Sequence, residues 1–431
     1  MRYLSPILFM AAVLAVASAE NRLLLVQTVW SPGSHSPIVS LPSEKENVIN
    51  SWPDGLGALT EAGVRQSLEL GAQLRRRYIR GFQLFDGSLN RQMYVASSNV
   101  DLALTSAAAV MAGLQGNGND TSNWRPFPIH VEEEQSALAW NTECPQADAI
   151  ENHQTRSSPW FQSKSNLNFI KQIVGRAGYR SFEGPGQLYS IWDALDSMRQ
   201  NDHPMPIWGE SEDIDRLKGL LDVSSALSYS QDIVARLRGG RLLELIVKKI
   251  KSKIACMAKD ANVEECANIV DQRMHAYSTD DLTLYALLGT LGAVPSVIQA
   301  PASAVAIELW RNLLGNLEIK VVTKTSADGE FTDVLVSDCP DLICDVQKFL
   351  SRSDRFISGN WQAECGMEPK FELEESPVHP DCFDVKDRSD SKNCIDWASA
   401  DYCENQIAVK YLFCRQTCLC NPRFAKRRRT Q

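Results

Sequence analysis

The distribution of cysteines constrains this chain more than any other feature. The sequence holds 12 cysteines, an even number, as expected where disulfides form. Six are spread widely, at Cys144, Cys256, Cys266, Cys339, Cys344 and Cys365, and six crowd into the last fifty residues, at Cys382, Cys394, Cys403, Cys414, Cys418 and Cys420. A segment so short and rich in cysteine is held together by bridges rather than by a hydrophobic core. We therefore expect a large domain followed by a small disulfide-rich domain.

Residues 1–19 have the composition of a secretory signal peptide. Arg2 precedes a short apolar run, and the segment ends in Ala17-Ser18-Ala19, a small-x-small cleavage site. The alternative is a membrane anchor, but the run is too short to span a bilayer, and no later run is long enough. We expect a secreted, extracellular or lumenal protein with no transmembrane segment.

Apolar runs alternate with helical segments over most of the chain. Strands are expected at 22–30, 93–95, 274–278, 302–308 and 318–323, and helices at 60–77, 101–114, 164–177, 231–254 and 281–292. This order predicts an α/β fold, a doubly wound sheet flanked by helices with a helical cap insertion at about 133–255. The expected boundaries are 20–371 for the large domain, 372–381 for a linker, 382–420 for the small domain and 421–431 for a basic tail.

Composition also limits the partners. Across 431 residues the chain is 44% hydrophobic and 23% charged, which suits a globular protein with a full core. The formal net charge of -9 argues against a nucleic-acid partner and against a polybasic membrane footprint.

The turn after the first strand is unusual for what it lacks. Reactive groups of α/β proteins lie where strands end, and the strand at 22–30 runs into Ser31-Pro32-Gly33-Ser34-His35-Ser36-Pro37. This turn contains no Arg, Lys or carboxylate. Its candidate chemistry rests on three serines and one histidine.

Five segments resemble, in order, motifs of the histidine acid phosphatase family, which has the phosphoglycerate-mutase-like fold. They are residues 52–63 (WPDGLGALTEAG), 70–78 (LGAQLRRRY), 97–107 (SSNVD followed by Thr105-Ser106-Ala107), 124–130 (WRPFPIH) and 277–284 (YSTDDLTL). The similarity covers roughly residues 22–365. Each segment is weak alone, but five in the correct order are specific.

The resemblance implies a phosphohistidine mechanism whose residues are missing here. The family's first turn reads Arg-His-Gly-x-Arg-x-Pro, with a nucleophilic His and two phosphate-binding Arg. A third Arg precedes residue 97, and a late His-Asp pair supplies the general acid. In this chain the nucleophilic His position is Pro32, and the two Arg positions of the turn are Ser31 and His35. The third Arg position is Ala96. The late His position is Asp280, and the acid is retained as Asp281, while Gly33 and Pro37 of the turn are kept. The resemblance therefore predicts a degenerate site with no confident catalytic residue.

The same positions could support other chemistry. His35 could be a relocated nucleophile or a pH-sensitive contact, and Ser34 and Ser36 beside it could suggest a hydrolase, but the Gly-x-Ser-x-Gly elbow is absent. Asp280 and Asp281 could bind a metal, although consecutive side chains at a strand end usually diverge. We expect no metal and no cofactor. Basic residues supplied by the helical insert would revive phosphate binding.

The family resemblance also implies two bridges in the large domain. These are the short-loop pair Cys339–Cys344 and the long-range pair Cys144–Cys365. Cys256 and Cys266 remain and are paired by elimination.

Residues 382–420 resemble the ShK-toxin-like domain, named for a potassium-channel blocker and common in secreted nematode proteins. Six cysteines, Asp396-Trp397-Ala398 and the run 414–418 (CRQTC) carry the resemblance, which implies bridges Cys382–Cys420, Cys394–Cys414 and Cys403–Cys418. The spacer Cys418-Leu419-Cys420 is shorter than usual. Lys410-Tyr411 resembles a pore-plugging pair but is placed differently among the cysteines, so we expect a stabilising or protein-binding module.

These observations predict a secreted, glycosylated and disulfide-bonded protein that acts by binding. Asn119 begins the glycosylation sequon Asn119-Asp120-Thr121. The ligand would be an extracellular protein, a glycan or a small molecule, and a homodimer is compatible with the sequence. The competing hypothesis is an acid phosphatase with residual or altered activity that uses Asp281 and a surrogate nucleophile.

Overall fold

A mixed sheet lies at the centre of the larger of two units, residues 1–368 and 369–431, in the computed structural model. The structure describes residues 21–44, 52–116, 126–131, 137–139, 142–258, 261–367, 386–406 and 408–420. The expected signal peptide, the sequon at Asn119, the linker 372–381, Cys382 and the basic tail lie outside these described residues. No helix in these ranges is long and apolar enough to span a bilayer.

The described part of the sheet has eight strands. Their order is β3-β2-β4-β1-β5-β6-β7, and β8 pairs with β6. The bounds are β1 Arg22–Trp30, β2 Met93–Ser97, β3 Ile129–Val131, β4 Met274–Ser278, β5 Ala304–Arg311, β6 Leu317–Lys324, β7 Thr332–Val334 and β8 Ile343–Asp345. The first four in this order run parallel, and every pairing from β1 to β5 onward is antiparallel.

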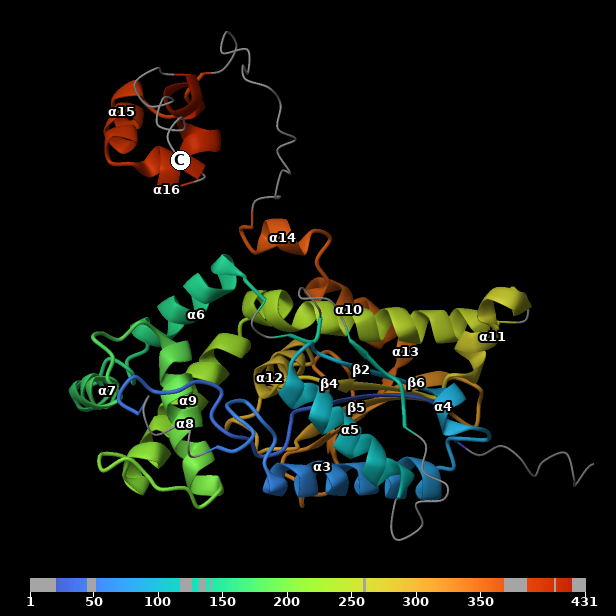
Figure 1. The fold of residues 1–431 in the computed structure, drawn as a ribbon. Coiled ribbons are helices and arrows are strands. Elements are labelled where there is room, and N and C mark those ends of the chain that lie inside the picture. Colours follow the sequence, from blue (N-terminus) through green and yellow to red (C-terminus); the bar gives the residue numbers. More distant parts are fainter. Residues whose placement is uncertain are drawn as a thin grey trace, which may run out of the picture. The chain divides into compact units, whose positions relative to one another are not determined.

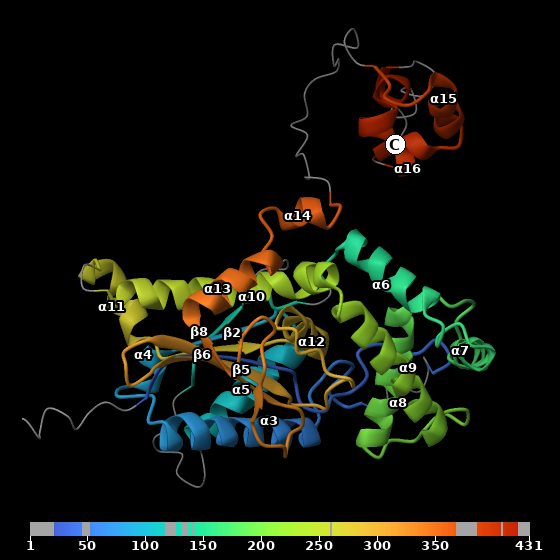
Figure 2. The same cartoon turned by 180° about the vertical axis from the view of Figure 1, so that it is seen from behind.

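Helices cover both faces of the sheet (Figures 1 and 2). One face packs on α3 (Glu61–Leu74) and α5 (Asp101–Gln115), and the other on α10 (Asp232–Cys256), α12 (Asp281–Thr290) and α13 (Val346–Ser353). The central strand β1 is buried over eight of its nine residues, because both faces are covered. The α/β fold with a sheet flanked by helices is thus confirmed.

The helical insertion divides into two parts. Its first four helices, α6 (Pro145–Ser157), α7 (Lys164–Arg176), α8 (Pro185–Gln200) and α9 (Ser211–Tyr229), stand beside one end of the sheet (Figure 1). Apolar side chains of α7, α8 and α9 form a separate core. Our predicted cap at 133–255 was too long, because Ile246, Val247 and Ile250 of α10 pack into the core of the sheet.

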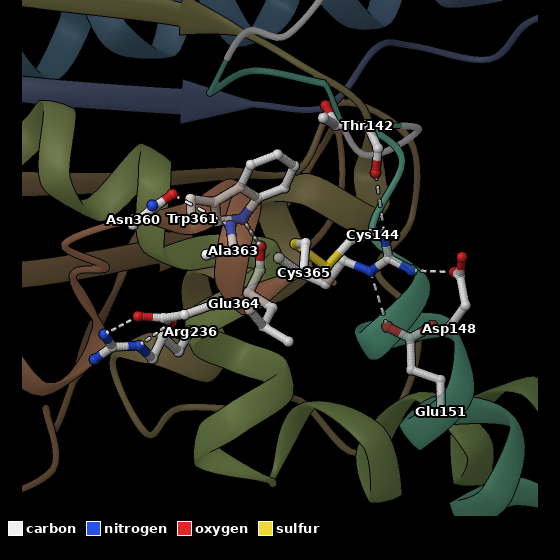
Figure 3. The surroundings of a disulfide bond; sticks show 12 residues. Thr142, Cys144, Asp148, Glu151, Arg236, Asn360, Trp361, Ala363, Glu364 and Cys365 are labelled. Carbon is white, nitrogen blue, oxygen red and sulfur yellow. Dashed lines mark hydrogen bonds and ion pairs between the residues drawn. A yellow bond between two sulfur atoms is a disulfide. The ribbon is translucent and has the colours of Figure 1, made fainter. Parts of the chain in front are cut away.

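Disulfides cross-link this unit at three places. The structure contains Cys144–Cys365, Cys256–Cys266 and Cys339–Cys344, which are the pairs expected from the sequence. Figure 3 shows Cys144–Cys365 beside α14 (Trp361–Glu364). There Glu364 accepts hydrogen bonds from Arg236 of α10 at 2.6 and 2.7 Å, and the Trp361 indole donates to the carbonyl of Leu237 at 2.7 Å. These contacts fix α14 on α10.

The smaller unit has a core made chiefly of cysteines. Cys394–Cys414 and Cys403–Cys418 are bridged, and Cys420 is also disulfide-bonded. Its elements are α15 Ser391–Ser399, α16 Tyr402–Asn405, η4 Val409–Phe413 and η5 Gln416–Cys420.

The larger unit also contains the short helices η1 Arg75–Gly81, α4 Leu89–Gln92, α11 Val263–Asp271 and η3 Asp354–Phe356.

Candidate binding site

Two strand ends bring the predicted site positions together. β1 and β4 are parallel neighbours, with Trp30 paired to Ser278, so the segments that follow both strands emerge at one edge of the sheet. The amide of Thr279 donates to the carbonyl of Trp30 at 3.0 Å. The turn at 31–37 and the Asp280-Asp281 pair therefore face the same space.

The turn is held in place by α3 and the loop before it. The amide and the hydroxyl of Thr60, the N-cap of α3, both donate to the carbonyl of Ser34 at 3.0 Å. A Cβ on Gly33 would lie 2.2 Å from the carbonyl oxygen of Gly63, so only glycine allows this approach. The Ser36 hydroxyl donates to the carbonyl of Gly55 at 2.8 Å.

The serines of the turn are structural. Ser31, Ser34 and Ser36 are each 2% exposed. The Ser34 hydroxyl accepts from the side-chain amide of Asn201 at 3.2 Å, and the Ser36 hydroxyl accepts from the backbone amide of Ala58 at 2.9 Å. These hydrogen bonds of Ser34 and Ser36 hold the turn to its surroundings.

A cavity of about 270 Å³ opens above the turn. It is lined by Ser31, Pro32, Ser34, His35 and Ile38 from the first turn, Leu102 from α5, Tyr189, Trp192, Asp193, Asp196, Ser197, Arg199 and Gln200 from α8, Lys218 from α9, Asp280 and Asp281 from α12 and its cap, and Ile298, Gln299, Ala300 and Pro301 from the segment before β5. Five of the six predicted family positions thus line one cavity. The sixth, Ala96, is fully buried in β2 and packs in the sheet core instead.

Asp281, at which the family resemblance implies a retained acid, is held by a residue of α8. The Tyr189 hydroxyl donates to the Asp281 carboxylate at 2.6 Å, and the amide of Leu282 donates to its other oxygen at 3.0 Å. Burial raises the pKa of Asp281, while the Tyr189 hydrogen bond and nearby His35 oppose the rise. Burial, together with Asp281, places the pKa of Tyr189 well above its usual value, so Tyr189 remains a donor.

Asp280 has a separate role. Its carboxylate caps α12, accepting from the amide of Thr283 at 2.7 Å and from the Thr283 hydroxyl at 2.8 Å. The two adjacent carboxylates therefore point to different partners, in line with the divergence expected of consecutive residues. Among the described residues, no group of three or more His, Cys, Asp or Glu is arranged to hold a metal ion.

His35 lies between a backbone oxygen and a buried carboxylate. Its Nδ1 is 2.8 Å from the carbonyl oxygen of Ser36, and its Nε2 is 3.7 Å from an oxygen of Asp193. The other Asp193 oxygen accepts from the amide of Ile38 at 2.9 Å, and burial raises the pKa of Asp193 against the opposing charge of His35. Since both ring nitrogens face oxygen acceptors, His35 is not placed to take a proton from a serine hydroxyl.

The cations of the cavity are already paired. Arg199 contacts Asp196 at 2.5 Å and Asp215 at 2.7 Å. Lys218 contacts Asp222 at 2.9 Å. Four carboxylates and two permanent cations line the cavity, so its field is anionic.

Comparison with known proteins decides the family. The model described as "Histidine phosphatase superfamily (branch 2)" matches residues 38–326, more than half of the chain. The chain belongs to this family. Relatives include the putative acid phosphatase 5 of Caenorhabditis elegans (29% identity over 377 residues, 83% of this chain and 82% of that protein) and the lysosomal acid phosphatase of Homo sapiens (30% over 361 residues, 80% of each).

Solved structures agree with this histidine phosphatase fold. The phytase of Citrobacter braakii superposes with a TM-score of 0.58 at 15% identity, covering 80% of this chain and 99% of that one. A phytase of Hafnia alvei gives 0.58 at 16%, covering 81% and 99%. At such low identity the likeness concerns the fold alone.

The cap contributes site residues that the sequence analysis missed. Tyr189, Trp192, Asp193, Asp196 and Arg199 recur every three or four residues along α8, which places them on one helix face. A helix face on which two aromatic residues are followed by three charged residues is the signal that could have found them. Without the fold, nothing tied that helix face to the turn at 31–37.

Proposed function

We propose that this histidine phosphatase homologue has lost phosphomonoester hydrolysis and acts by binding a ligand in the cavity. The observation that carries the proposal is Pro32. The family resemblance assigns the phosphorus-attacking imidazole to this position, and proline has no side-chain nucleophile. Pro32 lines the cavity. The matched family range also begins at residue 38, so the turn lies outside it.

The electrostatics of the cavity support the proposal. The resemblance assigns the three phosphate-binding Arg to the positions of Ser31, His35 and Ala96. A hydrogen bond to a charged group contributes about 1.5–3 kcal/mol, so these changes remove several kcal/mol of phosphate binding. Arg199 and Lys218 of the cap do enter the cavity, but each already contacts an aspartate. They do not replace the missing cations.

The competing function is an acid phosphatase with residual or altered activity. Asp281 favours it, since the general-acid position is retained and its pKa is raised by burial. A surrogate nucleophile would still be needed. His35 is the histidine that lines the cavity, but its nitrogens face the carbonyl oxygen of Ser36 and the carboxylate of Asp193.

Phosphatase assays distinguish these functions. Hydrolysis of a phosphomonoester is measured on the purified protein from pH 4 to 8, with vanadate binding in parallel. We expect neither turnover nor vanadate binding. Turnover that disappears in both His35→Ala and Asp281→Asn, while His153→Ala on the exposed surface retains it, would establish an active phosphatase and end the proposal.

We also propose that the protein is secreted or lumenal, glycosylated at Asn119, and carries a ShK-like C-terminal module that stabilises it or binds another protein. Its bridged cysteines support an oxidising compartment. The bridges Cys394–Cys414 and Cys403–Cys418 match the connectivity that the ShK resemblance implies. Mass spectrometry of protein secreted from eukaryotic cells tests the cleavage before Glu20, the glycan and the Cys382–Cys420 bridge together.

A further inference from the structure

Two carboxylates in the cavity, one buried and one half-buried, interact with a single histidine, His35. Asp193 is 4% exposed, and the half-buried Asp281 accepts a hydrogen bond from Tyr189. Asp193 and Asp281 also act on each other, since the charge of Asp193 raises the pKa of Asp281. Within the described residues, neither has an ion pair with a Lys or Arg, and the ion pair of Asp193 is with His35, at 3.7 Å. Buried carboxylates without a cation are costly, so this pair favours a cationic ligand.

The wall beside these carboxylates is aromatic. The rings of Tyr189 and Trp192 lie 5.6 Å apart at 57° and belong to the same face of α8 as Asp193. Ile38, Leu102 and Ile298 line the cavity as well. Organic cations are attracted to aromatic faces, and their carbon skeletons suit apolar walls. A metal ion would gain nothing from such walls.

Two residues that line the cavity, Trp192 and Gln299, carry polar atoms without partners. The indole nitrogen of Trp192, a residue that is 9% exposed, has no hydrogen-bond partner among the described residues. In the same part of the chain, both amide atoms of Gln299 are buried and unsatisfied. Buried polar atoms are nearly always paired in folded proteins. These donors and this acceptor suit a ligand that has a hydroxyl group besides its cation.

We propose that the cavity binds a small hydroxylated organic amine, with the ammonium group at Asp193 and Asp281 and the skeleton against Tyr189 and Trp192. The inference rests on the proposed loss of phosphate chemistry. A cavity of about 270 Å³ limits the ligand to a small molecule. The ammonium balances the carboxylates. The polar atoms of Trp192 and Gln299 are buried in the structure, so the hydroxyl pairs with them only after these side chains rotate toward the cavity.

Three related probes separate these contributions. Calorimetry at pH 7 compares tyramine, which has both groups, with 4-ethylphenol, which lacks the amine, and phenethylamine, which lacks the hydroxyl. We expect tyramine to bind best, with 4-ethylphenol weaker by roughly tenfold or more, as for the loss of one charge-assisted contact. Equal binding of 4-ethylphenol and tyramine, or no binding of either amine, would overturn the inference.

Variants place the binding in this cavity. Asp193→Asn and Asp281→Asn should each weaken tyramine about tenfold or more. Asp341→Asn, an exposed aspartate outside the cavity, should leave binding unchanged. Circular dichroism checks that each variant is folded, and thermal unfolding of the wild type with and without tyramine reads binding without any substitution. Unchanged tyramine affinity in both cavity variants refutes the inference.

The outcomes also separate this inference from the proposed function. If the protein binds no amine and hydrolyses no phosphomonoester, the inference of an amine site is refuted and the proposed loss of catalysis stands. If the protein hydrolyses phosphomonoesters, the proposed function is refuted, and the inference of an amine site, which rests on it, is refuted as well.

Discussion

The hydrogen bond from Tyr189 to Asp281 offers the sharpest test of how the cap holds the cavity. Its donor is on α8 and its acceptor begins α12, so it joins cap to sheet domain at 2.6 Å. A hydrogen bond to a charged group contributes about 1.5–3 kcal/mol, against about 0.5–1.5 kcal/mol for a neutral pair. Where the pH lies above the pKa of Asp281 and the carboxylate is ionised, Tyr189→Phe should therefore lower the free energy of unfolding by about 1.5–3 kcal/mol.

The effect should depend on pH in a defined direction. Burial raises the pKa of Asp281, and the Tyr189 hydrogen bond favours the ionised form, so the variant raises this pKa further. As pH falls through the pKa of Asp281, the carboxyl takes up a proton and the bond becomes a neutral one. The difference between wild type and Tyr189→Phe should then shrink toward about 0.5–1.5 kcal/mol.

Urea unfolding followed by tryptophan fluorescence measures the loss of unfolding free energy in Tyr189→Phe and its change with pH. Trp192 reports on this region because it packs beside Tyr189. Tyr179→Phe is the matched control. Tyr179 lies outside the cavity, and its hydroxyl has no hydrogen bond to any described residue. A Tyr189→Phe effect as small as that of the control, or one that does not change with pH, would refute the reasoning.

Three further predictions concern the frame of the molecule. Replacing Cys144 and Cys365 by serine opens a loop with a sequence separation of 221, which should lower the free energy of unfolding by about 5 kcal/mol in the chain-entropy model. Urea unfolding measures this loss. The control Cys339→Ser/Cys344→Ser, with a separation of 5, should lose less. Gly33→Ala should lower the melting temperature, because the new Cβ meets the backbone of Gly63. Gly175→Ala, in open space on α7, should raise the melting temperature slightly, because alanine favours helix more than glycine does. Equal effects of the two substitutions would contradict the close approach of Gly33 and Gly63. His275 is buried and, with Lys249 and Lys253 nearby, its pKa falls from 6.5 to about 3, so its native form is neutral where the unfolded form is charged. Stability should fall as pH drops from about 6.5 to about 3, by roughly 4–5 kcal/mol at most; His275→Gln should flatten that slope, and exposed His153→Gln should not.

The fold followed from the sequence where burial leaves a simple pattern. The strand at 22–30 is a continuous apolar run because it is covered on both faces, and β1 has those bounds. The helix expected from residue 60 begins at its N-cap Thr60, whose hydroxyl accepts from the amide of Gly63 at 3.2 Å. The cap boundary was wrong, because helical periodicity does not reveal whether the apolar face of α10 packs on the sheet or on other helices.

The site was predictable only in part. Motif order located the turn at 31–37 and the Asp280-Asp281 pair, since parallel strand ends converge. Nothing in the sequence connected α8 with that turn, across more than 150 residues. The pairing of Arg199 with Asp196 and Asp215 could not be inferred either, because ion pairing depends on the orientation of α8 against α9.

The central claim is that this cavity no longer binds phosphate, and equilibrium titration tests it most directly. Inorganic phosphate is titrated into the full-length protein at pH 5 and pH 7 by calorimetry, with an active acid phosphatase as positive control. An anionic cavity with paired cations predicts a Kd weaker than about 1 mM at both pH values. Saturable phosphate binding in the micromolar range, abolished by substitutions in the turn, would contradict the account.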